Sequence, residues 1–332
     1  MMWIERLLRT LDRVQQRHTA LGFPVGVVKK FGDDLGGKHA ALLAYYGFVS
    51  LFPLLLVFTT VMAFALEGNQ ALQQRVIDTV VAQFPVLGPQ LRGSIGAIQG
   101  SGIGLVVGVI GTLWGGLGIT QSAQDALNAV WNVPRKDRPN FWLRLARGAG
   151  ALLLAAAALL GATVLAGRGA TLPGITGSIV SLAGSLVVNM LLVVVMFKLL
   201  TAATVPWIRL VPGAATAAVA WSVLQAVGVI IVTRQVARAN LVYGAFATVL
   251  VLLSWMLLTG RILIYAAEIN VVLARRLWPR SLLQPPLTEQ DRQVYTALAQ
   301  TAQLRPEQRV EVTFLPERDD GDDPQAPDER HG

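Results

Sequence analysis

Long runs of residues without charge constrain this chain more than any other feature of its sequence. Several are at least as long as the roughly 20 apolar residues that a helix needs to cross a lipid bilayer. The chain of 332 residues is 53% hydrophobic and only 14% charged, whereas soluble domains carry about 25% charged residues. A water-soluble fold would lack the polar side chains to cover its surface. The sequence therefore predicts an integral membrane protein.

We expect an all-α protein with about six membrane-spanning helices. Helices are the expected form because each one satisfies its backbone polar groups internally, and the runs are too long and too uniformly apolar for the strands of a membrane barrel. The apolar runs are Ala40–Leu66, Gly93–Gln124, Gly148–Gly167, Gly169–Phe197, Leu210–Thr233 and Ala239–Gly260, the last continuing through Arg261 and Glu268 to about Ala274.

The basic residues divide unequally between the two sides of this arrangement. Of the 28 Lys and Arg residues, 22 fall on one side, five on the other and one within a span. Cytoplasmic segments are enriched in Lys and Arg, so both termini are predicted to be cytoplasmic. The net charge of +8 is the sum of +14 over residues 1–280 and −6 over residues 281–332. Orientation in the membrane explains the basic excess better than nucleic-acid binding, which we do not expect.

Three regions are predicted: a basic N-terminal segment (1–39), a transmembrane domain (40–276) and a cytoplasmic tail (277–332). Apolar residues at helical spacing over 3–14 fit a helix that lies in the membrane interface or one that docks on the protein itself. Residues 68–100 fit two short amphipathic helices or a re-entrant hairpin. In the tail, Thr288 and Asp291 form a capping-box pattern that predicts a helix over 289–303. Beyond Leu315 the composition is typical of disorder.

Glycines recur every three or four residues in the second apolar run. This spacing places them on one face of a helix, where small residues let a neighbouring helix approach closely in lipid. A gating helix or a backbone that lines a passage is the alternative interpretation. The glycines are Gly104, Gly108, Gly111, Gly115 and Gly118.

Two charged residues interrupt the sixth run and are the sharpest polar features. Arg261 and Glu268 are seven residues apart, so they lie on one face of a helix, and a charge at membrane depth normally faces a partner or a wet cavity. We expect Glu268 to pair with Lys198 or Arg261. Either structural ion pairs or a path for a substrate or a proton would explain them. Further polar candidates are Asn270, Asp125 and Asn128, with Asp33, Asp34, Lys38 and His39 before the first span.

No catalytic pattern stands out. The chain has no Cys and three scattered His, and it lacks a Walker A motif, GxSxG and HExxH, which are the patterns that would place phosphate-binding loops, nucleophiles or zinc ligands. We therefore expect neither a cofactor nor a metal, and we do not expect an enzyme.

Three segments resemble the YihY/BrkB family of inner-membrane proteins. They are AALLAYYGFVSLFPLLL at 40–56, ALNAVWNVPRKDRPNFW at 126–142, and YGAFATVLVLLSWMLLTGRILIYAAEINVVLA at 243–274. In combination they cover the membrane body, and Arg261 has no counterpart in the family pattern. The positions that match the family motifs are Tyr45, Tyr46, Ser50, Phe52, Pro53, Asn128, Trp131, Glu268 and Asn270.

The resemblance implies a multi-pass bacterial inner-membrane protein in envelope lipid homeostasis. Translocation of phospholipid, or its transfer toward a periplasmic lipid carrier, is the expected role, with membrane lipids as partners. Such a role predicts a tapered cavity open to lipid. The family has also been labelled a ribonuclease, which these residues do not support. A transporter of small solutes or ions and a non-catalytic envelope scaffold remain alternatives, and the oligomeric state stays open.

Overall fold

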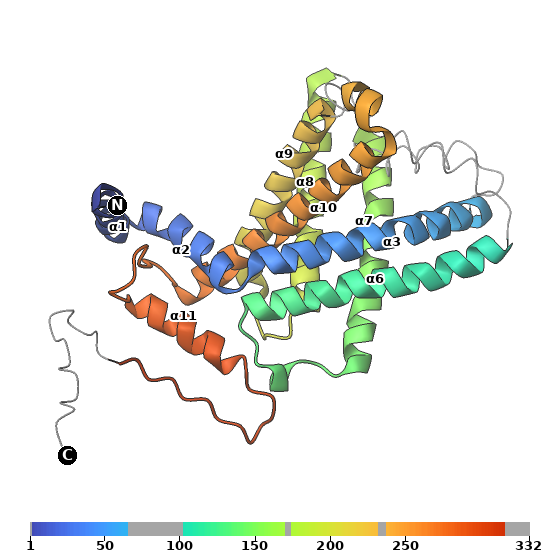
Figure 1. Ribbon diagram of the computed structural model, residues 1–332. Coiled ribbons are helices and arrows are strands. Elements are labelled where there is room, and N and C mark those ends of the chain that lie inside the picture. Colours follow the sequence, from blue (N-terminus) through green and yellow to red (C-terminus); the bar gives the residue numbers. More distant parts are fainter. Residues whose placement is uncertain (1, 66–101, 170–173, 232–236, 316–332) are drawn as a thin grey trace, which may run out of the picture.

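The computed structural model describes residues 2–65, 102–169, 174–231 and 237–315 (Figure 1). Every regular element in these ranges is a helix, in agreement with the all-α prediction. The elements are α1 (Met2–Arg17), α2 (Thr19–Asp33), α3 (Gly36–Ala65), α6 (Gly102–Val130), η1 (Arg135–Asp137), α7 (Phe141–Gly169), α8 (Gly174–Leu200), η2 (Trp207–Leu210), α9 (Val211–Ile231), α10 (Ala237–Arg275) and α11 (Glu289–Gln300).

Six of these helices correspond to the six apolar runs. Among the described residues, four candidate spans are long and apolar enough to cross a membrane: Phe141–Ala158, Leu182–Leu200, Trp207–Gly228 and Val249–Arg275. The helices α3 and α6 are 30 and 29 residues long, about 45 Å at 1.5 Å per residue. Their apolar sequences also suit a span, so the count of six stays a prediction.

The long helices form two groups that meet at one end. α3 and α6 run side by side, α10 crosses α3 and packs on α9, and α7, α8 and α9 pack in sequence (Figure 1). The end of α6 and the starts of α3, α7 and α9 lie together with the last turns of α8 and α10. We call this the basic end, because α2, η1 and η2 add their Lys and Arg residues there.

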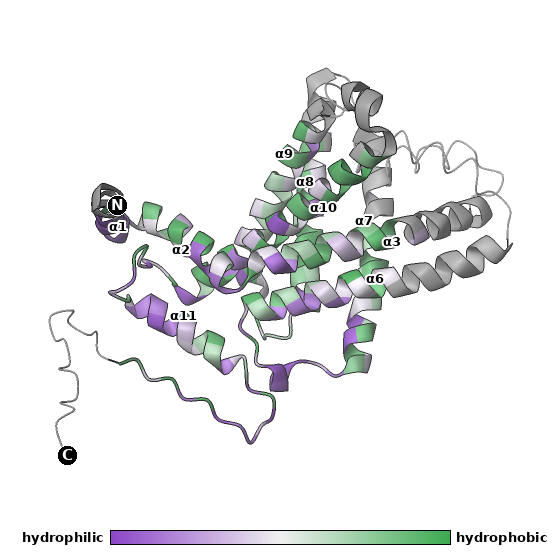
Figure 2. Ribbon diagram, viewed as in Figure 1, coloured by the Kyte–Doolittle hydropathy of each residue, from purple (hydrophilic) through white to green (hydrophobic). Residues whose placement is uncertain are grey.

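The basic end holds most of the described core. Residues from α6, α8, η2 and α10 pack there with less than a tenth of their surface exposed, among them Val130, Phe197, Leu210, Ile264 and Val271. Where Figure 2 colours them, the middle parts of α9 and α10 are mainly green, and α8, α9 and α10 expose large apolar side chains, whereas α11 and η1 are mainly hydrophilic. Exposed apolar side chains along a long helix are what a lipid environment requires.

Local sequence explains where several helices begin and end. Pro212 lies in the first turn of α9, where its missing N–H would have no helical partner. The side chain of Asn140 accepts a hydrogen bond from the Leu143 amide and caps the start of α7. α3 continues through Pro53. The predicted tail helix is confirmed, because α11 begins after Thr288 with both capping-box hydrogen bonds to Asp291 present.

Two polar side chains of the N-terminal helix α1 dock on the protein. Asp12 and Gln15 are buried, and Gln15 donates to the Arg280 carbonyl oxygen at 2.6 Å. Val14 is exposed. Docking and a place at the membrane interface are therefore compatible for this helix. The predictions for residues 68–100 and for the acidic end beyond Leu315 lie outside the described residues.

Candidate functional site

A buried charge cluster at the basic end joins α2, the turn before α3, α6 and α10. Its centre is Lys30, whose side chain has no exposed surface. The ammonium donates to the Asp34 carboxylate and, at 2.9 Å, to the carbonyl oxygen of Val130 in the last turn of α6. The Glu268 carboxylate lies 3.4 Å from the same ammonium and is also fully buried. One lysine therefore holds together two carboxylates and a helix C-terminus, where carbonyl groups lack helical partners.

The turn between α2 and α3 places Asp34 beneath the bundle. Leu35 has a positive φ of 55°, which turns the chain sharply between the two helices. A Cβ on Gly36 would lie 2.4 Å from the ring of Phe31, so only glycine fits at the start of α3. This close turn lets a lysine and an aspartate four residues apart face the interior together.

Asn132 and Arg275 complete the cluster on the α6 side. Asn132 donates to Asp34 Oδ1 at 3.2 Å and accepts from Arg275 at 3.4 Å. Arg275 also donates to the Trp131 carbonyl oxygen at 2.7 Å, and its guanidinium lies 6.0 Å from the centre of that indole ring. Trp131, a family-motif residue, is thus part of the wall of the cluster.

Glu268 is less completely bonded than the other members. Neither of its carboxylate oxygens has a hydrogen-bond partner among the described residues, and Lys30 is its ion-pair partner. The buried centre holds two carboxylates and one ammonium. Arg275, at the edge of the cluster, is exposed. A buried carboxylate without hydrogen bonds is costly for a fold. Proton binding at Glu268 is one chemistry that this arrangement permits.

The predicted partners of Glu268 were wrong. Lys198 donates to the Val205 carbonyl oxygen at 2.7 Å and lies 5.9 Å from the centre of the Trp207 ring. Arg261 is exposed. The partner of Glu268 is instead Lys30 of α2. This helix precedes the first apolar run and packs against α10. Sequence reasoning assigned Lys30 only to the orientation of the chain, although its spacing from Asp34 was a usable signal.

The two asparagine candidates bind backbone amides. Asn128 is buried and accepts from the Ala202 N–H at 2.8 Å, which fixes the segment after α8. Asn270 accepts from the Gly213 N–H at 2.7 Å, which joins α10 to the first turn of α9. The Gly213 N–H is one of the amides that the first turn of a helix leaves unpaired, whereas the Ala202 N–H belongs to the segment after α8.

The first family segment packs against the glycine face of α6. A Cβ on Gly115 would lie 2.7 Å from the Ser50 Cα, and one on Gly118 would lie 2.5 Å from the ring of Tyr46. Ser50 is buried and donates to the Gly47 carbonyl oxygen. The packing interpretation accounts for these two glycines.

The remaining family-motif residues of α3 and the remaining glycines of α6 show fewer described contacts. Tyr45 is exposed, and its ring meets that of Tyr46 edge to face at 5.2 Å. Pro53 is partly exposed within α3. The side chain of Phe52 and the surroundings of Gly104, Gly108 and Gly111 lie outside what the structure describes.

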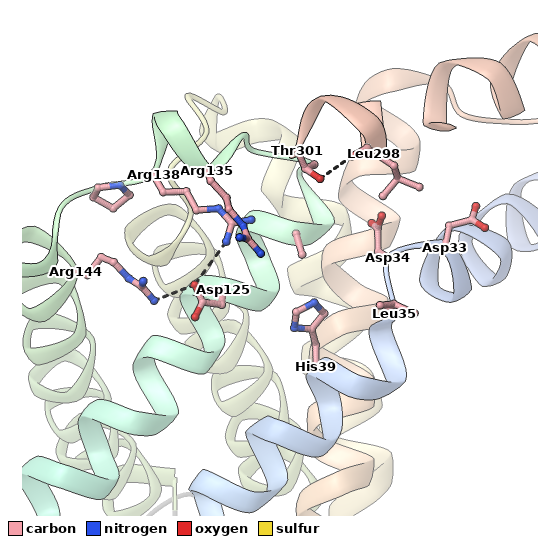
Figure 3. A pocket seen from close by; sticks show the side chains of 12 residues that line it. Asp33, Asp34, Leu35, His39, Asp125, Arg135, Arg138, Arg144, Leu298 and Thr301 are labelled. Carbon is pink, nitrogen blue, oxygen red and sulfur yellow. Dashed lines mark hydrogen bonds and ion pairs between the residues drawn. The ribbon is translucent and has the colours of Figure 1, made fainter. Parts of the chain in front are cut away.

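Asp125 lies in a polar pocket beside the charge cluster (Figure 3). Its carboxylate pairs with Arg144 at 2.9 Å and with Arg138 at 3.7 Å. The pocket has a volume of about 680 Å³, and Leu298 of α11 and Thr301, directly after this helix, contribute to its wall. Asp34 lines this pocket as well, so the pocket and the charge cluster share a residue.

A second buried cluster, which the sequence analysis missed, fixes the C-terminal segment. Arg280 is fully buried and pairs with Asp291 at 2.6 Å and with Asp33 at 2.8 Å. Asp12 of α1 accepts from the Leu282 amide at 2.9 Å. Arg280 follows the last membrane helix, where a basic residue is ordinarily read as an orientation signal. Its burial depends on the return of α11 beneath the bundle.

Replacing Asp291 by asparagine should release α11 from this site. Arg280 would keep a single carboxylate partner, and breaking a buried pair costs about 3 kcal/mol or more. Limited proteolysis of the full-length protein should then cleave between Arg275 and α11 at least tenfold faster. Glu289→Gln changes an exposed carboxylate in the same helix and should leave cleavage unchanged. Equal cleavage of both variants would contradict the role of the pair.

Asp291 in this second cluster predicts how pH affects the docking of α11. Burial raises the pKa of Asp291, but hydrogen bonds from Arg280, the Ser281 amide and Thr288 outweigh it and hold the pKa below the ordinary 3.8. Such a carboxylate stabilises the fold fully above its unfolded pKa, and the contribution is lost as the pH falls through the folded value. Docking of α11 should therefore stay constant down to about pH 4 and weaken only below it.

Among the residues that the structure describes, no three His, Cys, Asp or Glu side chains are grouped to hold a metal ion. The site can therefore be characterised by its ion pairs, its unpartnered carboxylate and the adjoining pocket. These properties suit binding of a charged group or a proton.

Comparisons with known proteins agree on the family. The model of the family described as virulence factor BrkB matches residues 27–290. The chain is 26% identical over 152 residues to the inner membrane protein YhjD of Escherichia coli, covering 43% of this chain and 44% of that protein. It is 25% identical over 280 residues to a UPF0761 membrane protein of Rhodospirillum rubrum, covering 78% of this chain and 61% of that protein. No solved structure matches the chain.

The matched region includes the whole charge cluster and every described membrane helix. It begins at residue 27, just before Lys30, and ends at residue 290, within α11. The chain spans between two fifths and two thirds of the length of these relatives. With its apolar helices, these matches make it a bacterial inner-membrane protein that belongs to the BrkB family.

Proposed function

We propose that this protein translocates or transfers phospholipid in the inner membrane. In this proposal both termini and the basic end are cytoplasmic, and a periplasmic lipid-carrier protein accepts lipid on the other side. The membrane spans and the cytoplasmic segments 1–39 and 277–332 work together in this function. The protein performs no covalent chemistry on its substrate.

The observation that carries the proposal is a polar pocket at the end of long helices that expose apolar side chains. The pocket at the basic end is bounded by α3, α6 and the start of α7. Just outside it, Phe141 and Trp142 are 61% and 73% exposed, as aromatic side chains at a membrane interface commonly are. A phospholipid has the matching form, because its headgroup is charged and its chains are apolar. The pocket lies at the end of the helices, so it takes the headgroup and does not enclose a whole lipid.

Glu268 provides the sharpest test of this function. The protein would be reconstituted in liposomes with phospholipid that carries a fluorescent headgroup, and dithionite would bleach the label exposed outside. Wild-type protein should bring the label of the inner leaflet to the outside, whereas empty liposomes should not. Glu268→Gln should slow this exchange at least tenfold while the protein remains folded, because the substitution removes the charge and keeps the shape.

The control is Glu289→Gln, which makes the same chemical change at an exposed position and should leave the rate unchanged. Exchange no faster than in empty liposomes would contradict lipid translocation. A Glu268→Gln variant that loses its fold would instead assign a structural role to the charge cluster.

A transporter of small solutes or ions is the second candidate. The observation that favours it is the buried group of Lys30, Asp34 and Glu268, since ionisable residues inside a membrane domain often mark ion or proton paths. This candidate predicts proton or ion flux into liposomes that lack labelled lipid. Such flux without lipid exchange would favour it over the lipid proposal.

A further inference from the structure

We propose that the pocket beside Asp125 binds a phosphate group. The site would take a phosphate ester of the kind found in lipid headgroups. Lipid as the source of this phosphate rests on the proposed function, whereas the phosphate site itself rests on the residues that line the pocket.

Three arginines form one wall of the pocket (Figure 3). Arg135 lies in η1, Arg138 follows it, and Arg144 lies in the first turn of α7. Arg138 and Arg144 share a single acid, Asp125, and even the same oxygen of its carboxylate. No carboxylate lies within ion-pair distance of Arg135 in the described part of the chain. The wall therefore carries three positive charges against one negative charge.

The opposite wall carries two acids that have partners of their own. Asp34 and Asp33 lie there, but each already pairs with a buried cation, Lys30 and Arg280 respectively. The side chains of Lys30 and Arg280 have no exposed surface. Both cations also pair with a further buried carboxylate, Glu268 or Asp291, so these acids are engaged on their own side of the pocket. On the arginine side three guanidinium groups face one carboxylate, and the expected ligand there is an anion.

His39 adds a polar group that lacks a partner. It lines the pocket and faces the arginine wall (Figure 3). Its Nδ1 atom is buried without a hydrogen-bond partner among the described residues. An anion with several acceptor oxygens could bind His39 and the guanidinium groups together, as phosphate does with arginine clusters. A carboxylate offers two oxygens and would satisfy fewer of these groups.

The position of the arginine wall indicates where the phosphate comes from. Arg144 lies two and three residues after the exposed Trp142 and Phe141, which places the guanidinium groups near the level of an interfacial aromatic belt. Clusters of Lys and Arg beside a membrane helix commonly bind the headgroups of anionic lipids. A lipid phosphate is therefore the source that fits this position.

The test compares two double variants of the full-length protein purified in a phosphate-free maltoside detergent. Arg138→Gln/Arg144→Gln removes two arginines of the pocket. Arg209→Gln/Arg276→Gln removes two exposed arginines that do not line it. Binding of phosphatidylglycerol, of diacylglycerol and of inorganic phosphate would be measured by native mass spectrometry and by the shift of the unfolding temperature.

We expect the wild type to bind phosphatidylglycerol and to bind diacylglycerol at least tenfold more weakly. The pocket variant should lose at least tenfold in affinity for phosphatidylglycerol, and the control variant less than twofold. Asp125→Asn should strengthen binding several-fold, because it removes the carboxylate that competes for the two arginines. This opposite sign separates a lost ligand contact from a general loss of folding.

Two results would overturn the proposal: equal binding of phosphatidylglycerol by the folded pocket variant and the wild type, or equal binding of diacylglycerol and phosphatidylglycerol. Binding of inorganic phosphate that depends on Arg138 and Arg144, without binding of phosphatidylglycerol, would support the phosphate site and contradict the lipid function. Lipid binding without lipid exchange in liposomes would likewise support the site and contradict translocation.

Discussion

Replacing Lys30 by methionine should lower the free energy of unfolding by about 3–5 kcal/mol, the cost of leaving a buried charge without its partner. The substitution would leave Asp34 and Glu268 as two buried carboxylates without their ammonium, and it would remove the hydrogen bond to the Val130 carbonyl oxygen. Methionine keeps most of the volume of the lysine chain, so a cavity does not confound the result. Unfolding by a denaturing detergent in micelles would measure the loss.

Lys38→Met is the matched control, because Lys38 is exposed at the start of α3 and only eight residues away. It should change stability by less than about 0.5 kcal/mol, as surface substitutions usually do. The double variant Lys30→Met/Glu268→Gln should regain part of the loss, since one of the two unpaired charges is then gone. A double variant no more stable than Lys30→Met would show that Glu268 does not interact with Lys30.

The expected rescue also separates this cluster from an ordinary surface ion pair. Residues in one buried network show coupling energies of about 0.5–3 kcal/mol in double-mutant cycles, whereas distant sites add independently. Lys30 and Glu268 are 238 positions apart in the sequence. Coupling between them would therefore test directly that α2 packs beneath α10.

The long apolar helices could be predicted because their signal is local. Each run alone contains enough apolar residues for a helix of membrane length, and the observed bounds of α9 and α10 differ from the predicted runs by only a few residues. The helix α11 was predictable for the same reason, since Thr288 and Asp291 carry the cap within four residues. Such features need no knowledge of what packs against them.

Partners at the site could not be predicted, because they depend on tertiary packing. The cost of a charge at membrane depth indicated that Glu268 needs a partner, but the sequence offered several cations for it. Lys30 and Arg280 resembled the other basic residues that flank the spans. What distinguishes them is burial, which follows from the packing of α2 against α10 and of α11 against the segment that follows α10. The pocket likewise combines side chains from four separate segments.

Replacing Gly213 by alanine should destabilise the bundle by about 3 kcal/mol or more, through overpacking and a broken buried hydrogen bond. A Cβ on Gly213 would lie 2.0 Å from the Ala266 carbonyl oxygen and 2.6 Å from the Asn270 side-chain nitrogen. The first of these atoms belongs to the backbone of α10, so the helices themselves would have to separate. The Gly213 N–H would then lose Asn270, its acceptor at 2.7 Å.

Gly161→Ala in α7 is the control, because a Cβ there would meet no atom within 4 Å. It should be neutral or stabilising by up to about 1 kcal/mol, since alanine favours a helix more than glycine does. Detergent unfolding of both variants measures the difference, and a Gly213→Ala variant as stable as the wild type would contradict the close crossing of α9 and α10. Glu268 lies between Ala266 and Asn270 on the segment that must move. Lipid exchange by any Gly213→Ala protein that still folds should therefore fall together with its stability.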